Sequence, residues 1–370
     1  MVTAARPAHP APSVRTVLGD LPAAELGVCD AHDHLFLRSP LLPGQELDDP
    51  AAAAAELRAF AAAGGRAVVQ WTPYGMGRGA GHLAELSRTT GVRVVAATGL
   101  HQARHYAPAL LDRVRDRLAE LFVAELTVGI GRVEGIEGLE PSTGLAVPGG
   151  GGGAARRAAR AGRDTETPPR AERDTETPPR AERVSETSPR AGLIKVAGGF
   201  HGLDGHARAT MAAAAVAHQR TGAPIGVHLE LGTAALDVLD LLCGELGVAP
   251  DRVILGHLNR SPDLAVHREA AELGAYLAFD GPSRAHHATD WRLSDALSAL
   301  ADAGHADRLL LGGDTTTATA RFVNGGPGLP HLLRGLRARL ELGLPAELVT
   351  RVFTANPARA FAVDWPAPAG

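Results

Sequence analysis

The chain has 370 residues, of which 45% are hydrophobic and 21% charged, and its formal net charge is −4. This length suits one large domain with room for an insertion. The slightly acidic balance gives no electrostatic reason to expect nucleic acid or a membrane as a partner, and no run of 18 apolar residues occurs. Cys29 and Cys243 fit neither a disulfide framework nor a zinc–thiolate motif, so we expect two buried thiols in a reducing, cytoplasmic compartment.

Residues 1–15 are rich in alanine and proline and predict a flexible N-terminal tail, after which strand and helix patterns alternate. The segment 51–63, for example, has Asp49 and Pro50 before it and two glycines after it, which are typical of the two ends of a helix. Strands are predicted at 28–34, 67–71, 92–97, 193–197, 224–229, 252–256, 275–279 and 308–311. Helices are predicted at 51–63, 82–90, 108–126, 206–220, 233–246, 262–273, 291–303, 332–342 and 346–353. Eight alternating βα units indicate a parallel sheet closed into a (β/α)8 TIM barrel, an α/β fold.

Residues 140–190, between the third and fourth predicted strands, break this regularity. The decapeptide at 163–172 is repeated unchanged at 173–182, and neither copy contains a large apolar residue. Such a sequence cannot bury enough surface to offset the entropy of ordering, so we predict a disordered low-complexity insertion, with a docking segment for a partner as the alternative. The predicted domain is therefore a single one that comprises 16–139 and 191–363, followed by a C-terminal tail at 364–370.

The first predicted strand ends in two histidines one residue apart, His32 and His34. Because side chains alternate along a strand, both imidazoles project to the same side and can bind one metal ion. Two histidines at this spacing are by themselves weak evidence for a metal site, since they also occur in ordinary loops. Further candidate ligands stand at the ends of later strands, where the βα loops of a barrel form its active site, namely Lys195, His228, His257 and Asp314.

The spacing of these residues fits repeating βα units of about 30 residues. One such unit separates Lys195 from His228, and another separates His228 from His257. Asp314 follows His257 at the distance of two units. The interval from His34 to Lys195 is far too long for three units until the insertion at 140–190 is set aside, and the remainder then divides into three.

Four histidines and one aspartate suit Zn²⁺, Mn²⁺ or Co²⁺. Because they exceed what one catalytic zinc ion needs, the set predicts two divalent metal ions about 3.5–4 Å apart. A bridging anion could come from Lys195, if its neutral amine takes up CO₂ to form a carbamate. An ion-paired lysine at a strand end is the alternative for this residue.

Several motifs in order resemble the phosphotriesterase family of the amidohydrolase superfamily. They occur at residues 16–19, 25–27, 32–35, 97–100, 191–197, 256–257 and 356–359. The resemblance implies a (β/α)8 barrel with a binuclear, usually zinc, centre that is bridged by a carboxylated lysine and a hydroxide. It also implies hydrolysis of an ester bond in a small-molecule substrate, and possible homodimers.

Carried over by position, the resemblance implies two ligand sets and one proton acceptor. The more buried metal ion would be held by His32, His34, Asp314 and Lys195, and the more exposed one by Lys195, His228 and His257. The resemblance also implies that Asp314 accepts a proton from the bridging water in addition to binding metal. Asp314 and Lys195 are thus the predicted catalytic residues.

The sequence departs from the family at its proton relay. Phosphotriesterases place a histidine just after the aspartate that ends the seventh strand, and an acid shortly after the histidine of the sixth. Here Gly281 follows Asp280, and Leu258, Asn259 and Arg260 follow His257. This difference favours a lactone or carboxylic ester over an organophosphate as substrate.

Loop position alone suggests a set of residues that contact substrate, each of which could equally be an ordinary loop residue. They are Trp71, Tyr74, His101, Asp280 and Arg284, with His105 and His201 as further candidates. Asp280 could orient a ligand or the substrate, or simply pack at its strand end. Two other functions stay open, a metal-dependent phosphodiesterase or deoxyribonuclease on a similar barrel, and a barrel that binds a ligand without turning it over.

Overall fold

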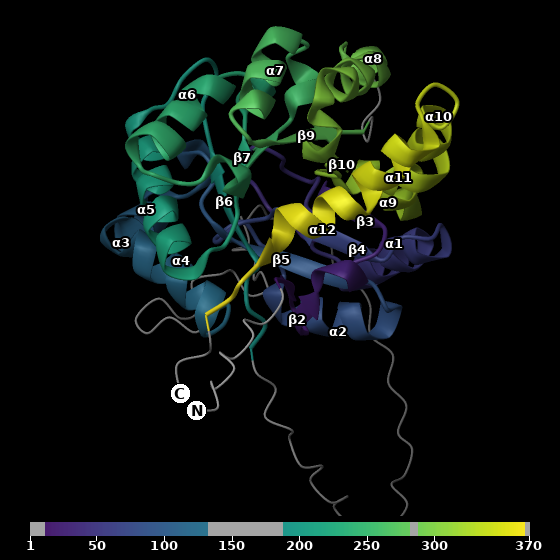
Figure 1. The fold of residues 1–370 in the computed structure, drawn as a ribbon. Helices are drawn as coiled ribbons and strands as arrows, with labels where there is room; N and C mark the ends of the chain where they lie inside the picture. The colour runs from purple at the N-terminus through teal and green to yellow at the C-terminus, as the bar shows by residue number, and fades with distance from the viewer. Residues whose placement is uncertain (1–11, 132–187, 282–287, 367–370) are drawn as a thin grey trace, which may run out of the picture. The chain divides into compact units, whose positions relative to one another are not determined.

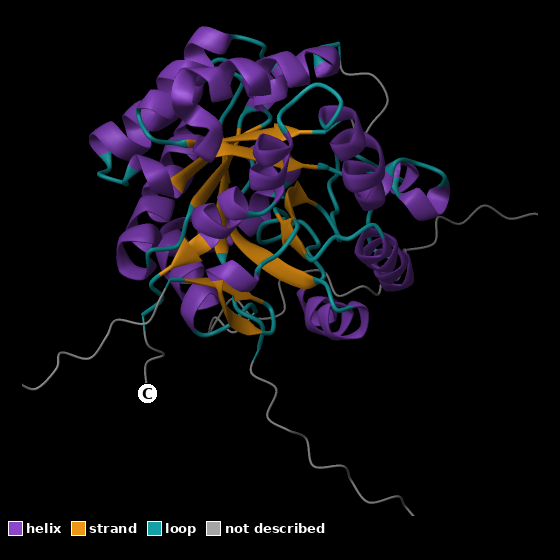
Figure 2. Ribbon diagram, turned by 45° about the vertical axis from the view of Figure 1, so that its right-hand side comes forward, coloured by secondary structure: helices purple, strands orange, loops and turns teal. Residues whose placement is uncertain are grey.

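Eight parallel strands form the central sheet of the computed structural model, which describes residues 12–131, 188–281 and 288–366. Neighbouring strands follow one another in chain order from β3 to β10, and Figure 2 shows them in orange inside a layer of helices. Their bounds are Cys29–Asp33 (β3), Ala67–Gln70 (β4), Arg93–Gly99 (β5), Leu193–Ala197 (β6), Ile225–His228 (β7), Val253–Gly256 (β8), Tyr276–Asp280 (β9) and Leu309–Gly312 (β10). The prediction of a (β/α)8 TIM barrel is confirmed.

Helices follow one another around the outside of this sheet in chain order (Figure 1). Their bounds are Pro50–Ala62 (α1), Ala80–Thr90 (α2), Pro108–Val114 (α3), Leu118–Thr127 (α4), Gly205–Thr221 (α5), Ala235–Leu239 (α6), Leu264–Glu272 (α7), Leu293–Leu300 (α8), Gly328–His331 (α9), Ala338–Leu340 (α10), Ala346–Phe353 (α11) and Ala355–Phe361 (α12). The side chain of Asp49 accepts hydrogen bonds from the first backbone N–H groups of α1, as its sequence predicts. The helix predicted at 108–126 is instead divided by a 3₁₀ turn at Arg115–Arg117, and only its second part, α4, has a broad buried face.

The predicted insertion at 140–190 falls almost entirely outside the described residues. The undescribed segment 132–187 lies between α4 and β6 in the chain, and therefore between the third and fourth barrel strands. Its predicted disorder and the predicted division into 16–139 and 191–363 remain predictions.

The N-terminal strand begins earlier than the predicted tail at 1–15 allows. Strand β1 (Ser13–Thr16) pairs with β2 (Gly19–Pro22) and with β11 (Ala362–Val363) in a separate antiparallel sheet. Arg15 holds this strand in place because its buried guanidinium pairs with Asp20 at 2.7 Å and donates to the backbone oxygen of Leu126 at 2.6 Å. Trp365, from the predicted C-terminal tail, stacks over the same guanidinium and donates a hydrogen bond to Ser13.

The barrel closes where β10 meets β3. The backbone N–H of Asp314 donates to the oxygen of His32 at 3.0 Å, just beyond the end of β10. A side chain at Gly312 would place its Cβ 2.5 Å from that same oxygen, so only glycine permits this approach. The first and last strands therefore bring their terminal residues together.

Among the described residues, no helix is both long and apolar enough to cross a bilayer.

His267 of α7 is buried where this helix packs on the sheet. Its ring lies edge-on against Phe279 of β9, and the residue is 1% exposed. Burial lowers the pKa of His267 to about 4. The imidazole is therefore neutral in the folded protein over the whole range in which an unfolded histidine takes up a proton.

We expect this histidine to make folding less favourable in mild acid. Between pH 6.5 and 4 the unfolded chain binds a proton at His267 that the folded chain does not, so stability is lost as pH falls through this window. From pH 7 to pH 5 the loss attributable to one such group is about 2 kcal/mol. Urea unfolding at both pH values should show a loss smaller by about this amount in His267→Leu than in the wild type. Equal losses in the two proteins would contradict the assignment.

Candidate metal centre

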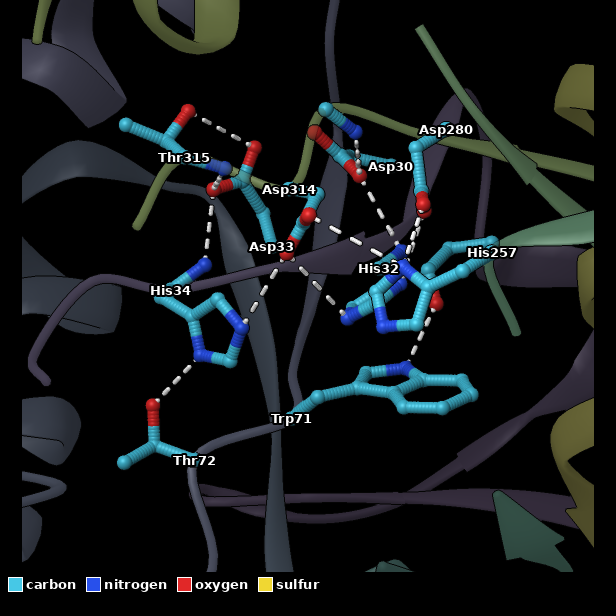
Figure 3. Close-up of polar contacts among 12 residues, drawn as sticks. Asp30, His32, Asp33, His34, Trp71, Thr72, His257, Asp280, Asp314 and Thr315 are labelled. Carbon is cyan, nitrogen blue, oxygen red and sulfur yellow. Dashed lines mark hydrogen bonds and ion pairs between the residues drawn. The ribbon is translucent and has the colours of Figure 1, made fainter. Parts of the chain in front are cut away.

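Two histidines of the first barrel strand face one oxygen of Asp314. His32 lies on β3 and His34 follows it directly, while Asp314 follows β10. The Nε2 atoms of His32 and His34 lie 3.7 and 3.5 Å from Oδ1 of Asp314. All three residues are buried, and their donor atoms lie close enough together to hold one metal ion. Figure 3 shows the three side chains converging.

The hydrogen bonds of Thr72 determine which nitrogen of His34 is protonated. The Thr72 hydroxyl donates its proton to the backbone oxygen of Phe36 at 2.5 Å, so it can only accept from Nδ1 of His34, which lies 2.7 Å away. Nδ1 of His34 therefore carries the hydrogen, and Nε2, which faces Asp314, keeps its lone pair. Burial lowers the pKa of His34 to about 4, which also favours the neutral, metal-binding form.

Asp280 sets the protonation of two further rings in the same way (Figure 3). Its Oδ1 lies 2.9 Å from Nδ1 of His32 and its Oδ2 lies 2.5 Å from Nδ1 of His257. Burial raises the pKa of Asp280, but the two histidines more than offset this and hold it well below its usual range. Since the ionised carboxylate can only accept, both rings present N–H at Nδ1 and a lone pair at Nε2. His32, His257 and Asp280 could themselves hold a metal ion, but this pattern is typical of a carboxylate that orients metal-binding histidines.

His228, at the end of β7, has its hydrogen bond at Nε2 and not at Nδ1. Its Nε2 lies 3.3 Å from Oε2 of Glu230, and its ring packs edge-on against His257 and obliquely against His101. Burial lowers the pKa of His228 well below the usual value, with a further contribution from His257. The ring is therefore neutral, with Nδ1 as the nitrogen that keeps a lone pair if Nε2 donates to Glu230.

Lys195 projects from β6 into the same region and is 2% exposed. Burial lowers the pKa of its amine to about 7, against a smaller opposing effect of Asp314. Gly99 makes room for this strand, because a Cβ there would collide with the backbone oxygen of Lys195. A substantial fraction of the lysine is thus uncharged near neutral pH.

All six predicted ligands line one cavity of about 300 Å³. Apolar residues in the lining are Leu37, Leu41, Leu42, Pro73 and Met76. Polar and charged residues in the lining include His101, Arg104, His105, Glu230 and Arg260. The structure therefore brings together the side chains of His32, His34, Lys195, His228, His257 and Asp314, while their roles as ligands remain predictions.

Two of these residues have strained backbones. His257 and Asp314 adopt φ values of 65° and 50°, in the left-handed region that residues other than glycine rarely occupy. Such a conformation costs on the order of 1 kcal/mol or more and persists where the surroundings enforce it, often at functional sites. The side chains at both positions line the cavity.

Two buried carboxylates that the sequence analysis did not single out support this end of the barrel. Asp33 stands between the two histidines in sequence, and Asp30 lies two residues before His32. Their oxygens accept the backbone N–H groups of His32 in β3, of His34 directly after β3, and of Gly313 and Thr315 after β10, at 2.7–3.2 Å. Burial raises the pKa of Asp33 to about 6. The two acids therefore hold the loop after β10, which carries Asp314, against the first barrel strand, and their position beside the two histidines was the available signal.

The residues predicted to contact substrate lie in different places in the structure. Trp71 is fully buried, stacks on His32 with ring centres 4.1 Å apart, and donates to the backbone of Ala31, so it lies beneath the histidines and does not line the cavity. Tyr74 is also buried away from the cavity lining. His101 does line the cavity. Arg284 lies outside the described residues, and Asp280 contacts the two histidines, as its orienting role predicts.

The structure adds Arg260 to the centre. The sequence analysis noted this residue only because the segment after His257 has no acid. Its guanidinium pairs with Oδ2 of Asp314 at 2.5 Å and lies 3.9 Å from Oδ2 of Asp280. Burial raises the pKa of Asp314, but His257, His34 and Arg260 together hold it well below its usual range. Since Oδ2 of Asp314 is held by Arg260, Oδ1 is the oxygen offered to His32 and His34. Its position shortly after His257 was the only signal for this role.

Comparisons with known proteins agree with this geometry. The sequence profile of the Phosphotriesterase family matches residues 12–140 and 181–361. A phospho-furanose lactonase of Mycoplasmopsis synoviae is 27% identical over 366 residues, which cover 95% of this chain and 92% of that protein. An amidohydrolase structure from Mycoplasma synoviae has a TM-score of 0.73 at 26% identity, with 95% of this chain and 92% of the other covered. The organophosphorus hydrolase of Deinococcus radiodurans has a TM-score of 0.70 at 26% identity, with 97% and 100% covered.

The profile match spans most of the chain, and the similar structures extend over nearly its whole length. The barrel, the histidine and aspartate groups able to hold metal, and these similarities lead to one assignment. The chain belongs to the phosphotriesterase family of metal-dependent hydrolases.

Proposed function

We propose that the chain is a binuclear metal-dependent hydrolase of lactones or carboxylic esters, and that organophosphates are poorer substrates. The observation that carries the proposal is the convergence of six donor side chains on one cavity, with hydrogen bonds that leave lone pairs on all four histidines. Imidazole and carboxylate donors in this number suit two Zn²⁺, Mn²⁺ or Co²⁺ ions. When bound, such cations lower the pKa of a water molecule and polarise a scissile carbonyl.

The donors divide into two sets by position. His32, His34 and Asp314 would hold one cation, and His228 and His257 the other, with Lys195 between them. The burial of Lys195 supports carboxylation, because only an uncharged amine reacts with CO₂, forming the N–C bond of a carbamate and releasing a proton. The resulting anion has two oxygens and offsets the charge of two cations.

The surroundings of Asp314 favour a carboxylic substrate over a phosphotriester. Phosphotriesterases carry a relay histidine where this chain has Gly281, so no imidazole is present at that position to take a proton from Asp314. Arg260 occupies the place of the relay acid and already binds the second oxygen of Asp314. An arginine cannot accept a proton from Asp314, so this position cannot pass a proton onward. We therefore favour Asp314 as a metal ligand over a role as proton acceptor.

Two further observations support a lactone. The similar phospho-furanose lactonase covers nearly the whole chain. The apolar lining residues, which include Leu41 and Met76, suit the hydrocarbon part of an ester, and the polar residues of the same lining suit its oxygens. The presence of an organophosphorus hydrolase among similar structures makes a phosphotriester the natural comparison substrate.

Metal content is the first test. We expect about two transition-metal ions per chain in protein purified without chelator. Asp280→Asn should weaken metal binding about 10–100-fold, because an amide cannot accept both Nδ1–H groups as the carboxylate does. Lys195→Met should retain fewer ions than the wild type. The control Asp295→Asn changes an exposed residue of α8 and should bind metal normally. Metal-free wild-type protein would reject the proposal.

Substrate preference is the second test. With the metal-loaded protein, we expect kcat/KM for lactones or aryl esters to exceed that for paraoxon by at least about tenfold, which corresponds to roughly 1.4 kcal/mol of transition-state stabilisation. Lys195→Met should lose activity on all of them, which ties turnover to this site. A preference for paraoxon, or cleavage of DNA alone, would show that the proposed substrate class is wrong.

A further inference from the structure

Glu230 brings three hydrogen-bond donors together at one oxygen. It lies in the loop after β7, lines the cavity, and its side chain is 24% exposed. Its Oε2 atom lies 2.7 Å from Nη2 of Arg104, 2.9 Å from Nε2 of Gln102 and 3.3 Å from Nε2 of His228. A carboxylate in this position can only accept, so each of the three partners must present a hydrogen to it.

The same contacts connect three active-site loops. Gln102 belongs to the loop after β5, and its amide also donates to the backbone oxygen of Gly198, which follows β6, at 2.6 Å. The N–H of Gly198 in turn donates to the backbone oxygen of His228 at 2.9 Å. The backbone of His228 is thus fixed to the neighbouring strand end, and its ring is left to be oriented by what Nε2 contacts.

His228 differs from the other three histidines of the centre in the nitrogen it commits to a hydrogen bond. His32, His34 and His257 each engage Nδ1, with Asp280 or Thr72 as partner. In His228 the hydrogen bond is instead at Nε2, with Glu230 as the partner. Because a neutral imidazole has one N–H and one lone pair, the donor nitrogen of His228 is the opposite one, Nδ1.

We propose that Glu230 is a positioning residue, which holds His228 as the Nε2–H tautomer so that Nδ1 is the atom offered to the more exposed cation. The metal-binding part of this inference rests on the proposed function, whereas the tautomer does not. No substrate contact is required of Glu230. Its function is to fix the protonation and ring orientation of one ligand, as carboxylates beside metal-binding histidines commonly do.

Imidazole NMR of the full-length, metal-free protein tests the tautomer directly. With ¹⁵N-labelled histidine, we expect His228 in the wild type to show a protonated Nε2 and an unprotonated Nδ1. In Glu230→Ala the ring should lose this preference, and in Glu230→Gln, whose amide oxygen still accepts, the preference should be largely restored. An unchanged His228 tautomer in Glu230→Ala would overturn the proposal, whether or not the protein binds metal.

Metal occupancy gives the second readout. In Glu230→Ala, we expect one ion to be lost to a chelator about 10–100-fold more readily than in the wild type, while the other ion stays bound as tightly as before. Gln102→Ala removes a loop contact but leaves the acceptor for His228, so it should keep the wild-type tautomer. Glu341→Gln alters only a surface pair with Arg337 and should match the wild type in both readouts.

The outcomes separate this inference from the proposed function. If the wild type binds two ions and Glu230→Ala holds both equally well, Glu230 does not position a ligand. If the wild type binds none, the proposed function is wrong, and the NMR result still decides whether Glu230 sets the tautomer. Loss of both ions together in Glu230→Ala would indicate a general structural role and would also count against the proposal.

Discussion

The close approach of the first and last barrel strands is the constraint on which the rest of the centre depends. His32 and Asp314 belong to segments near opposite ends of the chain, yet a backbone hydrogen bond joins them directly. Gly312 permits this contact because it has no side chain. Asp30 and Asp33 then hold the loop after β10 against the first strand by accepting its backbone N–H groups. The contacts that join the first and last strands therefore also bring the two histidines and Asp314 together.

Once the strands are closed, hydrogen-bond acceptors decide what the assembled rings can do. Four imidazoles packed around one cavity would be poor ligands if they were protonated or if their lone pairs faced the barrel core. Burial lowers the pKa of His34 and His228, which favours neutral rings. Thr72, Asp280 and Glu230 then select the nitrogen that carries the hydrogen. The protein thus prepares the centre for cations through residues that need not touch them.

The sequence predicts the barrel and the six converging residues because both depend on short, regular units, in which each candidate ligand stands at the end of a buried apolar strand. Trp71 could not be placed this way. Its loop position suggested the rim, but its indole turns into the barrel, where Gly226 and Gly256 have no side chains to exclude it. Residues 13–15 look like tail in the sequence because the partner strand of β1, Ala362–Val363, is at the other end of the chain. Local pattern identifies an element or a residue type, whereas the partner that gives it a role is set by closure of the fold.

The role of Arg260 also depends on the closed fold. The sequence shows only that an acid is absent after His257, because the pairing of Arg260 with Asp314 depends on where two distant loops meet. An acid near Asp314 can pass a proton onward, but a guanidinium stabilises the aspartate as an anion and passes nothing. The second element of the relay, a histidine after Asp280, is also absent, because that position is Gly281. The proposed preference for lactones or carboxylic esters over organophosphates depends on this difference around Asp314.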